Sequence, residues 1–281
     1  MLFRSEGVGK GLSYQGPSTP FIAVPTTAGT GSEATKNAVL SQQNEDGFKK
    51  SFRHECLVPQ VAIVDPTLLV SCPPALLAAN GMDAFTQLLE SYVSSNANPL
   101  TDALAISGIT AFRDGFFAAW ENKDEMAGRT GRAQLAYAAL LSGITLAQTG
   151  LGSVHGLASP LGAFFPCPHG VVCGTLVAEA TEVNITALRE RDPKNVALSK
   201  YAHVGALLAN RSFDKQEDAL NTLVEVLRDW TDRLALPKLS SYGMQAAHLD
   251  KVVAHCRGGS MKTNPIVLTD AELRELLQRR L

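Results

Sequence analysis

Residues 150–170 read GLGSVHGLASPLGAFFPCPHG, a stretch in which two histidines, His155 and His169, stand among glycine, alanine, proline and aromatic residues. Glycine and proline at this density interrupt helices, and Pro168 places His169 near an expected helix start. The stretch has almost no other polar side chain that satisfies the two imidazoles. The two histidines therefore require partners from other parts of the chain.

The sequence on both sides of this stretch is rich in alanine and leucine with helical periodicity. Helix breaks are predicted at SSNANP (94–99), ENKDEMAG (121–128), the glycine cluster at 150–156 and ERDPKN (190–195). This pattern predicts an all-α helical domain over residues 73–281.

The first part of the chain differs. The runs FIAVP (21–25) and VAIVDP (61–66) are short, β-branched and closed by proline, as buried strands are. Between them lie a small-residue loop, TTAGTGSEAT (26–35), and a polar stretch, SQQNEDGFKK (41–50). We therefore predict a partial α/β domain over residues 1–72.

Composition restricts the class of protein. A hydrophobic content of 45%, a charged content of 19% and a net charge of -2 are typical of a soluble globular protein with no basic surface for nucleic acid. The apolar runs are shorter than a membrane span, and the N-terminus lacks the apolar core of a secretory signal. We therefore expect a cytoplasmic protein without nucleic-acid or membrane partners.

The cysteines are odd in number, scattered, and form no C-x-x-C pair, so we interpret them as reduced core or surface thiols. Their positions are Cys56, Cys72, Cys167, Cys173 and Cys256.

A helix over GMDAFTQLLESY (81–92) places Asp83 and Gln87 one turn apart on the same face. The alternative is a solvated helix face, but the flanking residues are apolar and a buried charge needs a partner. A carboxylate, an amide oxygen and the imidazoles of His155 and His169 are four possible ligands, a set compatible with Fe²⁺ or Zn²⁺. Each histidine alone also fits a core residue with satisfied hydrogen bonds.

Four motifs in a fixed order resemble the iron-containing (group III) alcohol dehydrogenase family. They are VPTTAGTGSE (24–33), VAIVDP (61–66), GMDAFTQLLESYVSSNANPLTDALA (81–105) and the stretch at 150–170. The resemblance implies a dehydroquinate synthase-like architecture: a dinucleotide-binding α/β domain, a helical domain, and a metal in the cleft between them. It also implies an oxidoreductase that interconverts an alcohol and an aldehyde or ketone by hydride transfer with NAD or NADP, and we expect a homo-oligomer.

The same resemblance assigns roles to individual residues. The implied metal ligands are Asp83, Gln87, His155 and His169. The implied catalytic residues are His155 and His169, which polarise the substrate oxygen with or without metal, and Ser159, at a position where the family often carries a histidine that relays a proton. The implied nucleotide contacts are Thr26, Thr27, Thr35 and the cation Lys49, with Ser32 a weaker candidate. By itself, the loop that carries the threonines fits a tight turn after a strand equally well.

Three departures from the family pattern modify these expectations. The family usually has histidine at the position of Gln87, and an amide oxygen is a weaker donor. We therefore expect low metal affinity or a site that works without metal, and a gain of Fe²⁺ or Zn²⁺ occupancy in Gln87→His. Ser159 can pass a proton through water but cannot hold one near pH 7.

The third departure is at the N-terminus, where family members carry roughly a hundred further residues with a glycine-rich phosphate turn. We expect a truncated chain that binds a nicotinamide cofactor poorly and leaves apolar faces of its sheet uncovered. One alternative function is therefore a catalytically weak or inactive remnant of such an enzyme. Another is a lyase of the dehydroquinate synthase type, which needs more basic residues than PLGAFFPCP (160–168) offers.

Overall fold

The computed structural model of the protein describes residues 12–42, 47–121 and 125–281. In these residues the strands lie before residue 73, and the first α-helix begins at Pro74. This order matches the predicted change from short β-branched runs to helical periodicity near residues 72 and 73. The division into two domains at this point stays a prediction.

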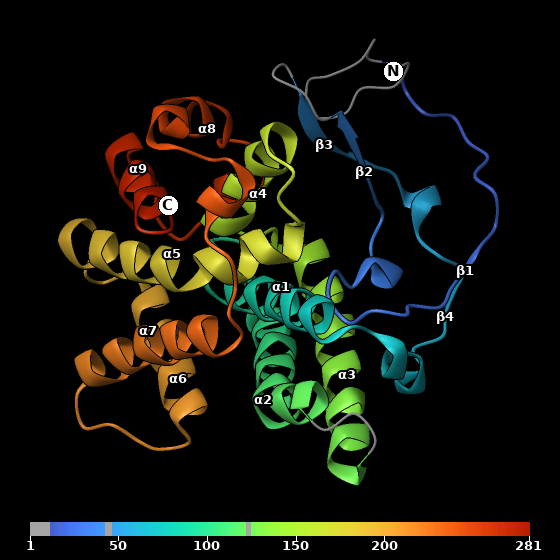
Figure 1. The fold of residues 1–281 in the computed structure, drawn as a ribbon, viewed down its shortest axis with the longest axis horizontal. Helices are drawn as coiled ribbons and strands as arrows, with labels where there is room; N and C mark the ends of the chain where they lie inside the picture. Colours follow the sequence, from blue (N-terminus) through green and yellow to red (C-terminus); the bar gives the residue numbers. More distant parts are fainter. Residues whose placement is uncertain (1–11, 43–46, 122–124) are drawn as a thin grey trace.

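The predicted strands at 21–25 and 61–66 form a short parallel ribbon. β1 (Ile22–Ala23) pairs with β4 (Val61–Ala62). The prediction that these strands are buried is wrong, because Ile22 is 60% exposed and Val61 is 47% exposed. The ribbon lies at the edge of the molecule away from the helices (Figure 1), and two strands alone cannot bury their own apolar faces.

A second pair of strands was not predicted. β2 (Asn37–Gln42) and β3 (Phe48–Arg53) are antiparallel, with Asn37 opposite Arg53 and Gln42 opposite Phe48. Sequence reasoning described residues 41–50 as a polar stretch because they lack apolar alternation. The Asp-Gly dipeptide at 46–47 is a common hairpin signal and was the available clue.

The rest of the described chain is mainly helical, and each predicted break separates two consecutive helices. The helices are α1 (Pro74–Val93), α2 (Pro99–Glu121), α3 (Met126–Thr149), α4 (Ser153–Phe164), α5 (His169–Arg191), α6 (Val196–Ala209), α7 (Gln216–Arg233), α8 (Leu249–His255) and α9 (Asp270–Gln278). The helices α8 and α9 lie at the opposite end of this part from α2 and α3 (Figure 1).

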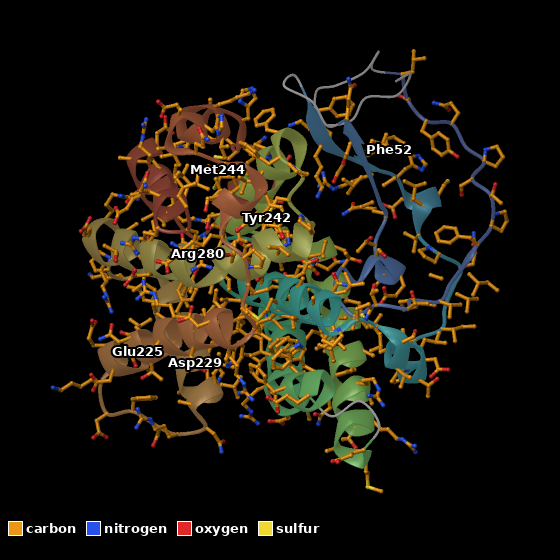
Figure 2. The ribbon with its side chains drawn as sticks, viewed as in Figure 1. Phe52, Glu225, Asp229, Tyr242, Met244 and Arg280 are labelled. Atoms are coloured by element: carbon orange, nitrogen blue, oxygen red, sulfur yellow. The ribbon has the colours of Figure 1, made fainter. Side chains whose placement is uncertain are left out.

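Helix α1 is the centre of the helical part and packs against α2, α3 and α5. One hydrophobic core joins α1 to α2, α3, α6 and α7, and a second lies among α4, α5, α8 and α9. Side chains crowd this region, where Tyr242, Met244 and Arg280 lie, and are sparse around the strands and the extended segments (Figure 2). The polar side chains Asp83, Gln87 and Glu90 on α1 are consequently buried.

Helix α5 is the one helix in the described ranges whose length and hydropathy suit a membrane span. However, 89% of its apolar window is buried inside the protein, as in the core helix of a globular fold. The helices α3 and α4 pass the same test only if taken together, and the chain bends by 98° between them. These features are weak evidence for a membrane span.

The loop at 26–35 is joined to the helical part by a close contact between two glycines. Gly31 has φ of 57°, in the left-handed region, and a Cβ atom on Gly143 of α3 would lie 2.1 Å from the Gly31 carbonyl oxygen. Only glycine at both positions allows the loop backbone to approach α3 this closely. The contact sets the position of the loop relative to the helices.

Candidate metal centre

Three helices meet where the predicted site lies. Helix α1 carries Asp83 and Gln87, α4 carries His155 in its first turn, and α5 begins at His169 directly after Pro168. The alternative that the α1 residues form a solvated helix face is excluded, since Asp83 is 1% exposed and Gln87 is 3% exposed.

The structure brings three of the four predicted ligands together. Asp83 Oδ1 lies 3.2 Å from His155 Nε2 and 3.8 Å from His169 Nε2. The two imidazole rings are 5.4 Å apart between centroids. Donor atoms from α1, α4 and α5 therefore face one another in the interior.

A cysteine that sequence reasoning interpreted only as a reduced thiol completes the group. Cys173 Sγ lies 3.6 Å from His155 Nε2 and 3.9 Å from His169 Nε2. The donor atoms of Asp83, His155, His169 and Cys173 all lie within 4.8 Å of one another, an arrangement that can hold a metal ion. The available clue was the spacing of His169 and Cys173, one turn apart on the same helix.

Gln87 presents its nitrogen, not its oxygen, to this group. Its Nε2 donates to Asp83 Oδ1 at 3.1 Å, and its Oε1 accepts from Ser142 Oγ of α3 at 2.7 Å. In this orientation the amide supports the carboxylate of Asp83 and leaves no oxygen toward the imidazoles. The expected gain of metal occupancy in Gln87→His stays a prediction.

Glu90 orients one of the imidazoles. Its Oε2 lies 2.6 Å from His155 Nδ1, and its Oε1 accepts from the Val154 backbone N–H at 2.7 Å. A carboxylate on one imidazole nitrogen directs the other nitrogen toward a metal and raises its basicity. Burial lowers the pKa of His155, but its acidic neighbours outweigh that effect and raise the pKa well above the ordinary value.

Two further donors are in protonation states that suit a cation, whereas burial raises the pKa of the Cys173 thiol to about 12, so a metal ion there would have to displace its proton. Burial raises the pKa of Asp83, but the two imidazoles outweigh this and hold the pKa at about 2, so the carboxylate is ionised. Burial lowers the pKa of His169 to about 4, so this imidazole is neutral. Its buried Nδ1 has no hydrogen-bond partner, while Nε2 faces Asp83. The donor set therefore fits a divalent metal ion.

Replacing Glu90 with glutamine is expected to weaken Zn²⁺ binding about tenfold. The amide can still accept from Val154, but its N–H then faces His155 Nδ1. This favours the tautomer whose proton is on Nε2, the nitrogen that should bind metal. Competition with a chelator measures the affinity. Glu121→Gln, at the surface pair of Glu121 with Arg233, is the control, and equal affinities in the two variants would refute the orienting role.

The group opens onto a cleft of about 670 Å³. Its polar lining includes hydroxyl and basic side chains from the segment at 30–36, β3, α4 and η6 (Ser260–Thr263): Thr30, Ser32, Thr35, Lys36, Lys49, Ser51, Arg53, Ser159 and Ser260. Gln87, His155 and His169 line the same cleft. A small molecule in this space is therefore within reach of the buried donors.

The predicted nucleotide contacts divide into two groups. Ser32, Thr35 and Lys49 line the cleft. Thr26 and Thr27 are exposed and are not among the residues that line it. Three of these residues thus line the same cleft as His155 and His169, while Thr26 and Thr27 are exposed, and their contacts with a nucleotide stay predictions.

Ser159 and Lys49 are in contact. The Ser159 hydroxyl donates to the Lys49 carbonyl oxygen at 2.7 Å, which connects α4 with β3. The Lys49 side chain extends along α4 near Gly162. Burial lowers the pKa of Lys49, against the attraction of the Asp83 carboxylate and of Cys173.

The sequence itself matches known family profiles. Residues 77–281 match the profile of the Fe-containing alcohol dehydrogenase family, C-terminal, and residues 2–66 match that of iron-containing alcohol dehydrogenase. The chain belongs to the iron-containing alcohol dehydrogenase family. This confirms the family predicted from the four motifs.

Individual members of the family are similar over most of this chain. Alcohol dehydrogenase 4 of Schizosaccharomyces pombe is 34% identical over 277 residues, which are 97% of this chain and 61% of that protein. The 1-propanol dehydrogenase PduQ of Citrobacter freundii is 35% identical, over 92% of this chain and 68% of that protein. The chain therefore spans about two thirds of the length of these relatives.

Solved structures of the family have the same fold. A 1,3-propanediol oxidoreductase superposes with a TM-score of 0.85 at 29% identity, covering 95% of this chain and 68% of that one. An alcohol dehydrogenase from Oenococcus oeni has the same TM-score and identity, covering 96% of this chain and 68% of that one. These matches confirm the predicted class, a partial α/β part followed by a helical domain.

Proposed function

We propose that this chain is the metal-binding and substrate-binding part of an NAD- or NADP-dependent oxidoreductase that interconverts an alcohol and an aldehyde or ketone. The convergence of donor atoms from Asp83, His155 and His169 beside a cleft of about 670 Å³ carries this proposal. Relatives named 1-propanol dehydrogenase and lactaldehyde reductase favour a short aldehyde or alcohol as substrate class.

Some of these residues would hold the metal ion, and others orient its ligands. Asp83, His155 and His169 would hold Fe²⁺ or Zn²⁺, with Gln87 as the fourth residue implied by sequence. A divalent ion at this place supplies positive charge that polarises the oxygen of a bound alcohol or aldehyde. Glu90 keeps Nδ1 of His155 engaged, so that Nε2 faces the site. Ser159 keeps acceptor capacity for water while its proton lies on a carbonyl oxygen.

A nicotinamide cofactor, which accepts or delivers the hydride, would lie along the polar wall of the cleft. Ser32 and Thr35 offer hydroxyls for ribose or phosphate oxygens, and Lys49 offers a positive charge. Thr26 and Thr27 extend this set along the exposed part of the loop. We further propose a cytoplasmic homo-oligomer without nucleic-acid or membrane partners, and light scattering of the purified chain measures the oligomeric state.

The direct test is NADH oxidation by purified chain loaded anaerobically with Fe²⁺, or with Zn²⁺, in the presence of propanal. We expect loss of absorbance at the reduced-nicotinamide band and formation of propanol. The matched variants are His155→Ala, expected to lose activity, and His255→Ala, at the exposed last residue of α8, expected to keep it. Metal-loaded chain that neither oxidises NADH nor forms propanol would favour the inactive remnant.

Replacing Lys49 with methionine is expected to weaken NADH binding about tenfold, because one charge-assisted hydrogen bond contributes about 1.5 to 3 kcal/mol and about 1.4 kcal/mol is tenfold in affinity. Fluorescence titration with NADH measures the effect. The exposed Lys262 provides the control variant Lys262→Met. A dissociation constant unchanged from the wild type in Lys49→Met would exclude a contact between this ammonium group and the cofactor.

A further inference from the structure

We propose that Cys173, not Gln87, is the fourth ligand of the metal centre, so that the site offers one carboxylate, two imidazoles and one thiolate and prefers Zn²⁺ to Fe²⁺. The inference rests on the proposed function in taking Asp83, His155 and His169 as the other ligands. Nothing in the family motifs pointed to this cysteine; its position in the fold does.

Four of the six distances among the donor atoms are near those of a tetrahedral site, and the other two are below 4.8 Å. For metal bonds of about 2.0 Å to nitrogen or oxygen and about 2.3 Å to sulfur, a tetrahedral ion separates N from S by about 3.5 Å and N from O by about 3.3 Å. The N to S distances here are 3.6 and 3.9 Å, and the N to O distances are 3.2 and 3.8 Å. For these four distances, binding would need shifts of a few tenths of an ångström.

Cys173 has the surroundings of a ligand. Its side chain is 0% exposed, and its sulfur faces the Nε2 atoms of both His155 and His169. The two imidazoles come from different helices, α4 and α5, so the sulfur is near a donor atom from each. One side of the site stays accessible, since the His169 side chain is 32% exposed toward the cleft.

Gln87 lacks the orientation of a ligand. Its nitrogen donates to Asp83 and its oxygen accepts from Ser142. Rotating the amide would bring Oε1 against Asp83 Oδ1, which places two acceptors in contact and loses a buried hydrogen bond. As it lies, Gln87 orients Asp83 in the way that residues behind metal ligands do.

Metal binding at Cys173 replaces the proton of its thiol. A metal–sulfur bond forms, the thiol proton is released to solvent, and no oxidation occurs. A thiolate is a soft ligand that favours Zn²⁺, whereas carboxylate and imidazole alone suit Fe²⁺ as well. A thiolate ligand from Cys173 in place of an amide ligand from Gln87 therefore shifts the metal preference of the site toward Zn²⁺.

Cobalt provides the first test, because Co²⁺ bound to a thiolate absorbs strongly in the near ultraviolet through sulfur-to-metal charge transfer. We expect this band in the Co²⁺-loaded wild-type chain and in Gln87→Leu. In Cys173→Ser we expect the band to disappear and the preference for Zn²⁺ over Fe²⁺ to fall about tenfold. Cys256→Ser is the control, because Cys256 is equally buried but lies outside the site.

X-ray absorption of the Zn²⁺-loaded wild type gives a readout that needs no variant. We expect one sulfur at about 2.3 Å and nitrogen or oxygen atoms at about 2.0 Å. Stoichiometric Co²⁺ or Zn²⁺ binding without a sulfur signal, or a charge-transfer band that persists in Cys173→Ser, would overturn the assignment of Cys173 and leave the proposed function standing. Failure of the wild type to bind either ion would overturn both.

Discussion

Replacing Asp83 with asparagine is expected to lower the affinity for Zn²⁺ by about a hundredfold. Structural zinc binds with about 10 to 16 kcal/mol, so one ligand in four accounts for about 3 kcal/mol, and about 1.4 kcal/mol is tenfold in affinity. Asp83 is the carboxylate of the group of four donors, and asparagine keeps its volume but removes the charge. Titration of metal-free chain with Zn²⁺ against a chelator of known affinity measures the change.

Asp102→Asn is the matched control. Asp102 pairs with Lys200 at 2.8 Å near the C-terminal end of α1, where Lys200 also donates to the Tyr92 carbonyl oxygen, so its replacement removes a carboxylate without touching the donor group. Circular dichroism verifies that both variants are folded. Equal zinc affinity in Asp83→Asn, Asp102→Asn and the wild type would refute the metal centre at this place.

Replacing Gly143 with alanine is expected to destabilise the chain by about 2 to 3 kcal/mol, near the upper range for overpacking. The new Cβ would lie 2.1 Å from the backbone oxygen of Gly31, which cannot rotate away as a side chain would. Gly31 is itself held in the left-handed region against α3. Thermal unfolding followed by circular dichroism should show a decrease in Tm on the order of 5 °C.

The same substitution should also affect the cleft. The loop next to Gly31 carries Thr30, Ser32 and Thr35, which line it, so displacement of the loop should weaken NADH binding as well. Gly258→Ala is the control for stability alone, since a Cβ there meets nothing within 4 Å but Gly258 itself lines the cleft. A Gly143→Ala chain with the Tm and the NADH affinity of the wild type would show that the loop adjusts without cost.

The helices and their boundaries were predictable because their signals are local. Asp83 and Gln87 lie on one face since a helix repeats every turn, and Pro168 precedes α5 since proline suits a helix start. The family motifs extended this to three of the converging donors. The hairpin of β2 and β3 was missed because its strands carry no apolar alternation, which is the signal that distinguishes a strand from a polar loop.

The sequence by itself determined the helical segments, the side chains that share a helix face, and the family. Tertiary structure alone decided that Cys173 joins the donor group, that Gln87 turns its nitrogen inward, and that the apolar ribbon of β1 and β4 lies exposed. The physical reason is the large separation of the contacting residues along the sequence, since Asp83 and Cys173 are 90 positions apart. Their contact depends on how α1 and α5 pack, and the direction of an amide depends on a hydroxyl supplied by α3.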